Sequence, residues 1–418
     1  MSSFITSITK GRKKTPEQLV RLAARDLQDL AEEQTVSELK NGVTPQEDLC
    51  KRLSQIKVIL YGDGDKAEVD EEKAIEVSKR IQEEGLMLQL IDKMDVIPFE
   101  ARKDTAQIFN NLMHKNIDGF VSYVNEHFAC VLKIAEGYAN PDIALNSGSM
   151  LRECIRYEQL TRMFLHSEQL WLFFDSFVHL PNFDVASDAF NTLRDILASP
   201  RNKQIASEFL EEKYEEVFEK YEMLLKSSNY VTRRRSLKLL GEILLDRSNF
   251  NIMMRYISSE RNLQQVMNLL RDKSPNIQFE AFHVFKVFVA NPKKPALIRN
   301  ILFKNQQKLC EFLTNFHQDK EEEDSQFSDE KKLIIDTLSA LEIPSPEELH
   351  REKMAAREAR EQRLREQRMR EEAEASVAQG VSDMKVASSE QSGGLPQEDA
   401  PLAQTQVQQP GTSDEGAA

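Results

Sequence analysis

Histidines, cysteines and clustered carboxylates are the residues of this 418-residue chain that could bind a metal or carry catalysis. The seven histidines include no i, i+4 pair, the spacing that puts two imidazoles on one helix face, and the four cysteines lack metal-type pairing. Asp63-Gly64-Asp65 begins like a calcium loop, but Ala67 takes the third ligand position, Glu68 the glycine and Ala74 the bidentate glutamate. We therefore expect no metal ion and no cofactor.

The sequence also lacks the motifs of the common enzyme classes. It contains no Gly-x-x-x-x-Gly-Lys, no Gly-rich dinucleotide loop, no His-Glu-x-x-His and no Gly-x-Ser-x-Gly. His283 follows Phe282 in a strongly apolar stretch, which suits a core or interface position better than a ligand. The sequence therefore predicts a protein that is not an enzyme.

Two groups of residues could instead bind a partner. Tyr230, Arg234 and Lys238 belong to a basic and aromatic cluster in a chain whose formal net charge is −14. Plain solubility of the charges, and packing of the tyrosine at a helix start, are the alternatives. The second group would line a groove between the last helices of the repeats, with an apolar anchor and a cation suited to an aromatic peptide bearing a carboxylate. It consists of Met267, Leu270, Lys308, Leu309 and Phe312, and core packing is the alternative for each.

A hydrophobic template that recurs five times must position these residues. Its copies are 42, 42, 46 and 46 residues apart, and apolar residues stand at offsets 0, 8 and 12, which fall on one helical face. Such a helix cannot bury its stripe alone, so repeats of this length stack into a solenoid. The fold class predicted is all-α, an armadillo/HEAT-like helical-repeat solenoid. The copies begin at Ala101, Ile143, Val185, Val231 and Ile277.

Offset 3 of the template is polar in every copy, and a solenoid turns such a set into a row along one face. The row is either a hydrated helical face or a ridge that binds a partner. Its members are Asp104, Asn146, Asp188, Arg234 and Glu280.

Composition divides the chain into four parts. Residues 1–14 form a flexible basic leader, and 15–341 form the helical-repeat domain, which opens on a capping box at Thr15 and Gln18. Helical periodicity covers 15–33, 46–60 and 73–92 before the repeats, and several further segments between the templates; the charge run 317–324 indicates a loop. Residues 345–376 form a charged Glu/Arg helix with few apolar residues, and 377–418 form a disordered tail rich in Ser, Gln, Gly and Pro.

The acidic balance argues against nucleic acid as the main ligand and gives no attraction to anionic membranes. No apolar run approaches 18 residues and the N-terminus has no h-region, so we expect no membrane insertion and a cytoplasmic location with reduced thiols. A monomer is the simplest state for an exposed solenoid.

Four stretches strongly resemble the morula-protein-25 family, also called calcium-binding-protein-39 or, in fungi, the hyphal-development family. They are Lys103–Asn111 (KDTAQIFNN), Ile143–Ile155 (IALNSGSMLRECI), Ser236–Arg247 (SLKLLGEILLDR) and Asn276–Pro292 (NIQFEAFHVFKVFVANP). The resemblance covers roughly residues 15 to 341 and ends before the charged helix.

The resemblance implies a horseshoe-shaped scaffold without catalytic activity. Such proteins use a concave face to hold a Sterile-20-family or germinal-centre protein kinase or pseudokinase in its closed conformation, in pathways of cell polarity, morphogenesis and septation. The positions that look like the concave kinase contacts are Tyr230, Arg234, Lys238, Arg247 and Phe250. The groove around Met267 looks like the pocket that takes a Trp-Glu-Phe type tail. A general helical-repeat adaptor for transport or phosphatase assembly is the alternative function.

Overall fold

The computed structural model describes residues 14–32, 44–62 and 69–359, together with 361–362, 364–366, 368–369 and 372. The chain divides into two compact units, Met1–Ile343 and Pro344–Ala418. Every regular element in the described residues is helical, so the predicted all-α fold is confirmed. The leader up to residue 13, the Asp63-Gly64-Asp65 stretch and the predicted disordered tail lie outside these residues.

Four helices form the N-terminal end of the first unit: α1 (Pro16–Glu32), α2 (Pro45–Tyr61), α3 (Glu71–Glu83) and α4 (Leu86–Asp92). The predicted capping box is present, because Gln18 N donates to Thr15 Oγ1 at 3.3 Å and Thr15 N donates to Gln18 Oε1 at 3.2 Å. The helical periodicity predicted over 73–92 is present as two helices, since Gly85 adopts a left-handed conformation (φ 60°) and separates α3 from α4.

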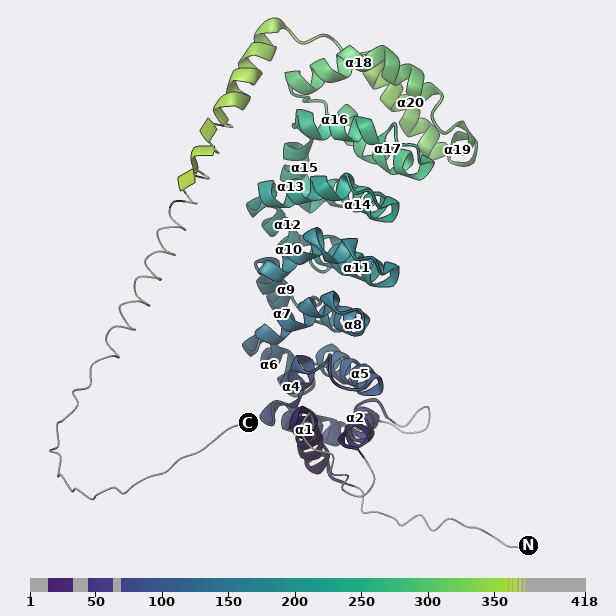
Figure 1. Cartoon of the computed structure of the whole chain (residues 1–418). Coiled ribbons are helices and arrows are strands. Elements are labelled where there is room, and N and C mark those ends of the chain that lie inside the picture. The colour runs from purple at the N-terminus through teal and green to yellow at the C-terminus, as the bar shows by residue number, and fades with distance from the viewer. Residues whose placement is uncertain are drawn as a thin grey trace, which may run out of the picture. The chain divides into compact units, whose positions relative to one another are not determined.

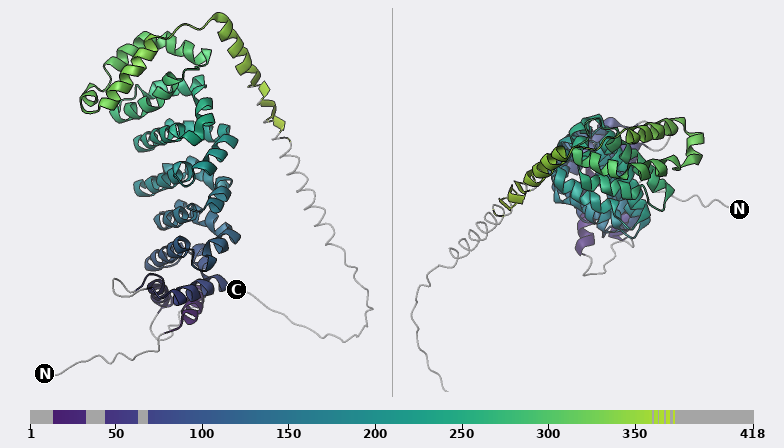
Figure 2. Two further views of the ribbon diagram at one scale, coloured as in Figure 1. Left: turned by 180° about the vertical axis from the view of Figure 1, so that it is seen from behind. Right: turned by 90° about the horizontal axis from the view of Figure 1, so that it is seen from above.

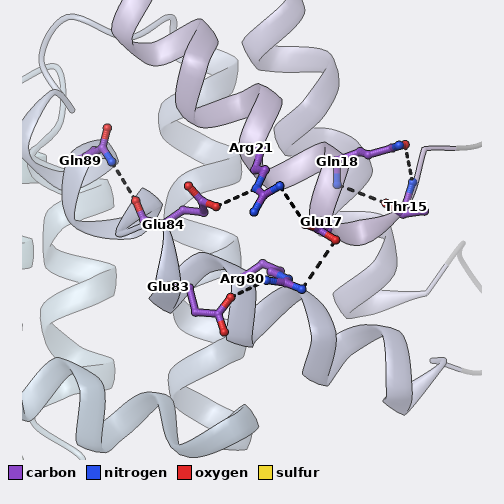
Figure 3. A network of polar contacts seen from close by, with 8 residues as sticks. All are labelled: Thr15, Glu17, Gln18, Arg21, Arg80, Glu83, Glu84 and Gln89. Carbon is purple, nitrogen blue, oxygen red and sulfur yellow. Dashed lines mark hydrogen bonds and ion pairs between the residues drawn. The ribbon is translucent and has the colours of Figure 1, made fainter.

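Ion pairs hold α1 onto the neighbouring helices (Figure 3). Arg21 lies 3.0 Å from Glu17 and 2.9 Å from Glu84, while Arg80 pairs with Glu83 at 2.7 Å and reaches Glu17 at 3.6 Å. These groups are largely open to solvent, so the pairs add little to the stability of this end. Most of the stability of α1 comes from its apolar face, which is buried against α2 and α3.

Each of the five repeats contains one long helix, and two short helices connect it to the long helix of the next repeat. We call the helices that carry the template the long helices; they have 16 or 17 residues, except α8, which has 11. They are α5 (Phe99–Lys115), α8 (Ala144–Cys154), α11 (Phe183–Ala198), α14 (Tyr230–Leu245) and α17 (Pro275–Ala290). The short pairs are α6 (Phe120–Glu126) and α7 (Ala129–Glu136), α9 (Glu158–Leu165) and α10 (Glu168–Asp175), α12 (Lys203–Glu212) and α13 (Tyr214–Leu225), and α15 (Phe250–Ile257) and α16 (Glu260–Leu269). Short 3-10 turns, η2 (Ile117–Gly119), η3 (Gly137–Ala139), η4 (Phe177–His179) and η5 (Arg247–Asn249), complete the connections.

The long helices stack on one another and form one layer of the solenoid. Helices α2, α5, α8, α11, α14 and α17 contact their neighbours in this order, and the short helices form a second layer beside them (Figures 1 and 2). The template residues lie at the interface as predicted. All fifteen positions at offsets 0, 8 and 12 are buried except Val231, which is half-buried. Burial of this continuous stripe is what holds successive repeats together.

The unit closes with α18 (Ala296–Thr314), α19 (Gln318–Glu323) and α20 (Ser325–Ser339). The loop predicted over 317–324 is wrong, because most of that charge run is helical. His317 turns the chain with φ 48°, and Glu321 of α19 accepts a bond from the buried ammonium of Lys331 at 2.7 Å. Lys320 lies 3.8 Å from the ring centroid of Phe279. These contacts anchor charged residues that the sequence pattern assigns to solvent.

The second unit begins with a helix over residues 346–359. Ser345 caps it, since Glu348 N donates to Ser345 Oγ at 3.1 Å and Ser345 N donates to Glu348 Oε2 at 3.0 Å. Its side chains are mostly exposed, and Arg357 pairs with Glu361 one turn away at 2.9 Å.

Candidate partner-binding site

Equivalent helix starts place two aromatic side chains at the surface of the long-helix layer. Asn182 caps α11 and Asn229 caps α14, each accepting two bonds from backbone amides of the first turn. The residue that follows each cap is aromatic and exposed: Phe183 is 63% exposed and Tyr230 is 39% exposed. The Tyr230 hydroxyl also accepts a bond from Asn276 at 3.2 Å, which lowers the pKa of this tyrosine. Sequence reasoning did not single out Phe183.

A basic groove of about 470 Å³ runs between α11 and α14. We call it the basic groove, and it is lined by Phe190, Asn191, Arg194, Tyr230, Val231, Arg234, Arg235, Lys238, Leu239 and Glu242. The predicted residues Tyr230, Arg234 and Lys238 therefore share one surface, because steps of four and eight residues follow one face of a helix.

Two of the four cations in the basic groove are held by the protein itself. Arg194 pairs with Glu242 at 2.9 Å, and Arg235 donates to the Ser187 carbonyl at 3.1 Å while stacking over a phenylalanine ring. Arg234 is 44% exposed, and its contact with Glu280 is long at 3.8 Å. Lys238 is exposed and pairs with no other side chain that the structure describes. Arg234 and Lys238 are thus the cations available to a partner.

The polar row at offset 3 serves mainly to link neighbouring helices. Asp104 of α5 pairs with Lys57 of α2, and Asp188 of α11 lies 2.8 Å from Arg152 of α8. Arg234 reaches Glu280 of α17 in the same manner. Asp104 is 5% exposed, so the hypothesis that this row is a ridge that binds a partner is wrong for Asp104. Among these residues, Arg234 suits a partner contact best.

A separate apolar groove of about 600 Å³ lies at the other end of α14. Leu245 and Phe250 are each 60% exposed there, and Leu333 of α20 is 61% exposed. Monomeric proteins seldom leave a cluster of large apolar side chains uncovered without a binding role. We call this surface the apolar groove, and its other lining residues are Met253, Met254, Ile257, Lys286, Val287, Ala290, Asn291, Pro292, Lys293, Glu330 and Ile334.

The structure places three of the five predicted contacts in the basic groove and Phe250 in the apolar groove, while Arg247 lines neither. Phe250 lines the apolar groove, and Arg247 is exposed three residues before it on η5. Tyr230 and Leu245 mark the two ends of α14, about 22 Å apart at 1.5 Å per residue.

The groove predicted near the C-terminal end involves α16 and α18, which pack against each other. Met267 and Phe312 are partly buried and Lys308 is exposed, so these three retain accessible surface. Leu270 and Leu309 are 1% and 8% exposed and belong to the core. A ligand for this groove stays a prediction.

Among the described residues, no group of three or more His, Cys, Asp or Glu side chains has an arrangement that could hold a metal ion. The described helices also include none with the length and apolarity needed to span a membrane.

Comparison with known proteins places these surfaces in context. The model of the Mo25-like family matches residues 6–342. The chain is 45% identical over 336 residues to the mouse protein named calcium-binding protein 39-like, covering 80% of this chain and 97% of that protein. It is 42% identical over 298 residues to the Mo25-like protein of Schizosaccharomyces pombe, covering 71% and 89%. It is 33% identical over 365 residues to the conidiophore development protein hymA of Emericella nidulans, covering 79% and 92%.

Proposed function

This chain belongs to the Mo25-like family, and we propose that it is a non-catalytic scaffold that binds and activates Sterile-20/germinal-centre-type protein kinases or pseudokinases. The observation that carries the proposal is the pair of grooves at the two ends of α14 in the long-helix layer. One offers the exposed ring of Tyr230 and two cations, and the other offers exposed aliphatic and aromatic surface. Binding hot spots favour these residue types.

The groove chemistry suits a folded partner with two contact regions. A partner carboxylate can pair with Lys238, which is exposed, or with Arg234, which is 44% exposed and whose contact with Glu280 is long at 3.8 Å. An apolar side chain of the partner can enter the groove around Phe250, because Lys238 and Arg234 lie about 10 and 16 Å from Leu245 along α14. Two contacts at a fixed separation select a partner conformation that presents both groups at once.

Activation by such a scaffold requires no chemistry from this chain. The continuous buried stripe makes the long-helix layer stiff, so the spacing of its two grooves is set before a partner binds. A surface that binds the closed kinase tenfold more tightly than the open one shifts that equilibrium by about 1.4 kcal/mol. We propose that the protein works in the cytoplasm, as a monomer, in signalling for cell polarity, morphogenesis or septation. The name of the hymA relative, a conidiophore development protein, is in keeping with that role.

A reconstituted kinase assay tests the proposal. Purified protein is mixed with each germinal-centre kinase of the same organism, and phosphorylation of a model substrate is measured alongside ATP turnover by this chain alone. We expect stimulation of at least one kinase, with no turnover by the scaffold. Lack of binding and stimulation across the whole set of kinases would refute the proposal. A pull-down dominated by transport or phosphatase subunits, without kinases, would favour the adaptor alternative.

A further inference from the structure

A pocket far along the solenoid from both grooves is built to receive a positive charge. It lies where α4 and α7 end, beside the start of α8, and has a volume of about 240 Å³. Helices α4, α7 and α8 are adjacent in the stack (Figure 1). We call it the acidic pocket, and it is lined by Ile91, Asp92, Met94, Asp95, Lys133, Ile134, Glu136, Gly137, Ala139, Asn140, Ile143 and Ser147.

The mouth of the acidic pocket carries an excess of negative charge. Asp92, Asp95 and Glu136 are exposed, and with Lys133 the charged lining residues sum to −2 (three negative charges and one positive charge). The Arg102 guanidinium donates to the Asp95 carbonyl at 2.7 Å and offsets part of this charge. Asp92 and Asp95 form no ion pair with any side chain that the structure describes. The ends of α4 and α7 add negative potential here, and the start of α8 beside them adds potential of the opposite sign.

The walls and the floor of the pocket are of a different kind. Ile91, Met94 and Ile134 are at most 5% exposed and provide an apolar lining. Ser147 is only 3% exposed, and its hydroxyl pairs with no group among the described residues. This hydroxyl packs against Gly137, where an added Cβ would overlap it, so the glycine keeps the space that the hydroxyl occupies. The hydrogen-bonding capacity of this hydroxyl is therefore open to a ligand or a water molecule that enters the pocket.

We propose that the acidic pocket binds the basic side chain, lysine or arginine, of a partner polypeptide. The aliphatic stem would pack on the apolar walls, in the manner in which long basic side chains bury their stems. The charged end would lie inside the pocket and donate to Ser147 Oγ, an acceptor that no described group of the protein uses, and the carboxylates at the mouth would attract it. The volume is below the range of about 300–1,000 Å³ that is usual for whole small molecules, and it suits a single side chain.

This inference does not depend on the kinase proposal. The pocket lies at the first two repeats, whereas the basic and apolar grooves lie along α11, α14, α17 and α20. A partner could thus contact the solenoid at an additional point, with a lysine or arginine on the contacting segment.

Methyl NMR with a defined probe tests the inference. The full chain is labelled at methionine and isoleucine methyl groups and titrated with the blocked pentapeptide Gly-Ser-Arg-Ser-Gly, its Lys analogue and its uncharged Gln analogue. Signals of Met94 and Ile143 report on the pocket, and Ile334 of α20 is the distant reference. We expect saturable shifts at the pocket for the two basic peptides only, with a dissociation constant of about 1 mM.

Charge-matched variants distinguish specific binding in the acidic pocket from general electrostatic attraction between a basic peptide and an acidic protein. Asp92→Asn with Asp95→Asn should weaken binding at least about tenfold, whereas Asp329→Asn with Asp336→Asn, an exposed pair on α20, should leave it unchanged. Ser147→Ala keeps all charges and should weaken binding by about threefold through loss of one hydrogen bond. Any of three results would overturn the proposal. The Gln peptide could give the same shifts as the basic peptides, or a pocket variant could bind with wild-type affinity. The third result is no shift with up to about 20 mM basic peptide.

Discussion

The buried ammonium of Lys331 should be essential to the C-terminal end of the solenoid. Its side chain is 2% exposed and donates to the carbonyls of Thr314 and Phe316, at 3.2 and 2.8 Å, and to Glu321 at 2.7 Å. Lysine is almost never fully buried unless it is paired, and here all three ammonium hydrogens have acceptors. The group thereby ties the end of α18 to α19 and α20.

Lys331→Met removes the charge while keeping an unbranched apolar stem of similar volume. The Phe316 carbonyl would then be left buried without a donor, at a cost of about 1–3 kcal/mol, and the half-accessible Thr314 carbonyl adds a smaller amount. Glu321 is 29% exposed and can turn toward water. We expect a total loss of about 2–4 kcal/mol from the free energy of unfolding of the last repeat.

Hydrogen exchange measured with urea unfolding locates this effect. A solenoid opens from its ends, so amide protection should fall in α18 and α20 while that of α5 and α8 is retained. Lys332→Met is the matched control, because that neighbouring lysine is exposed. If Lys331→Met left both the urea midpoint and the protection of α20 unchanged, the ammonium would not be the link that we infer.

Three further perturbations test other parts of the structure. Hydrogen bonds from Lys203 and Ser248 lower the pKa of Asp246 to about 2. The stability that this carboxylate contributes is therefore complete above about pH 4 and is lost as the pH falls toward about 2. In Asp246→Asn, the free energy of unfolding measured with urea should depend less on pH between about 4 and 2. Gly148→Ala should lower thermal stability, by about 2 kcal/mol or more, because its Cβ would overlap the Asp188 carboxylate; an unchanged melting curve would contradict that packing. Truncation after Leu341 should leave the melting temperature of the repeats within about 2 °C by circular dichroism, since the removed helix is mostly exposed and few buried contacts are lost.

The repeat architecture could be predicted from the sequence because burial enforces it at every copy of the template. Apolar residues at offsets 0, 8 and 12 lie on one face of a helix, and these positions are buried in the structure. Helix breaks were harder to predict. Gly85 gave a signal for the break between α3 and α4, but α6 ends and α7 begins around His127 and Phe128 without a glycine or proline.

The candidate surfaces were only partly accessible to sequence reasoning. Tyr230, Arg234 and Lys238 follow one helix face, so their shared groove could be predicted. The signal for Phe183 was present in its Asn182 cap, which matches the cap before Tyr230. No such signal marks the exposed apolar residues that line the apolar groove.

Leu333 and Ile334 illustrate this difficulty. They are neighbours of similar character, yet one is 61% exposed and the other 2% exposed. Only the packing of α20 on α17 and α18 decides which of the two is covered.

Client affinity of one double variant tests the scaffold proposal most directly. Arg234→Ala with Phe250→Ala removes one exposed anchor from each groove, and Arg201→Ala with Met223→Ala removes a comparable exposed pair elsewhere. Binding to a stimulated germinal-centre kinase should weaken at least about thirtyfold in the first variant and stay near wild type in the second. Kinase stimulation should fall in parallel, with an unchanged helical signal and melting temperature. Wild-type affinity and stimulation in the folded Arg234→Ala, Phe250→Ala variant would contradict the account.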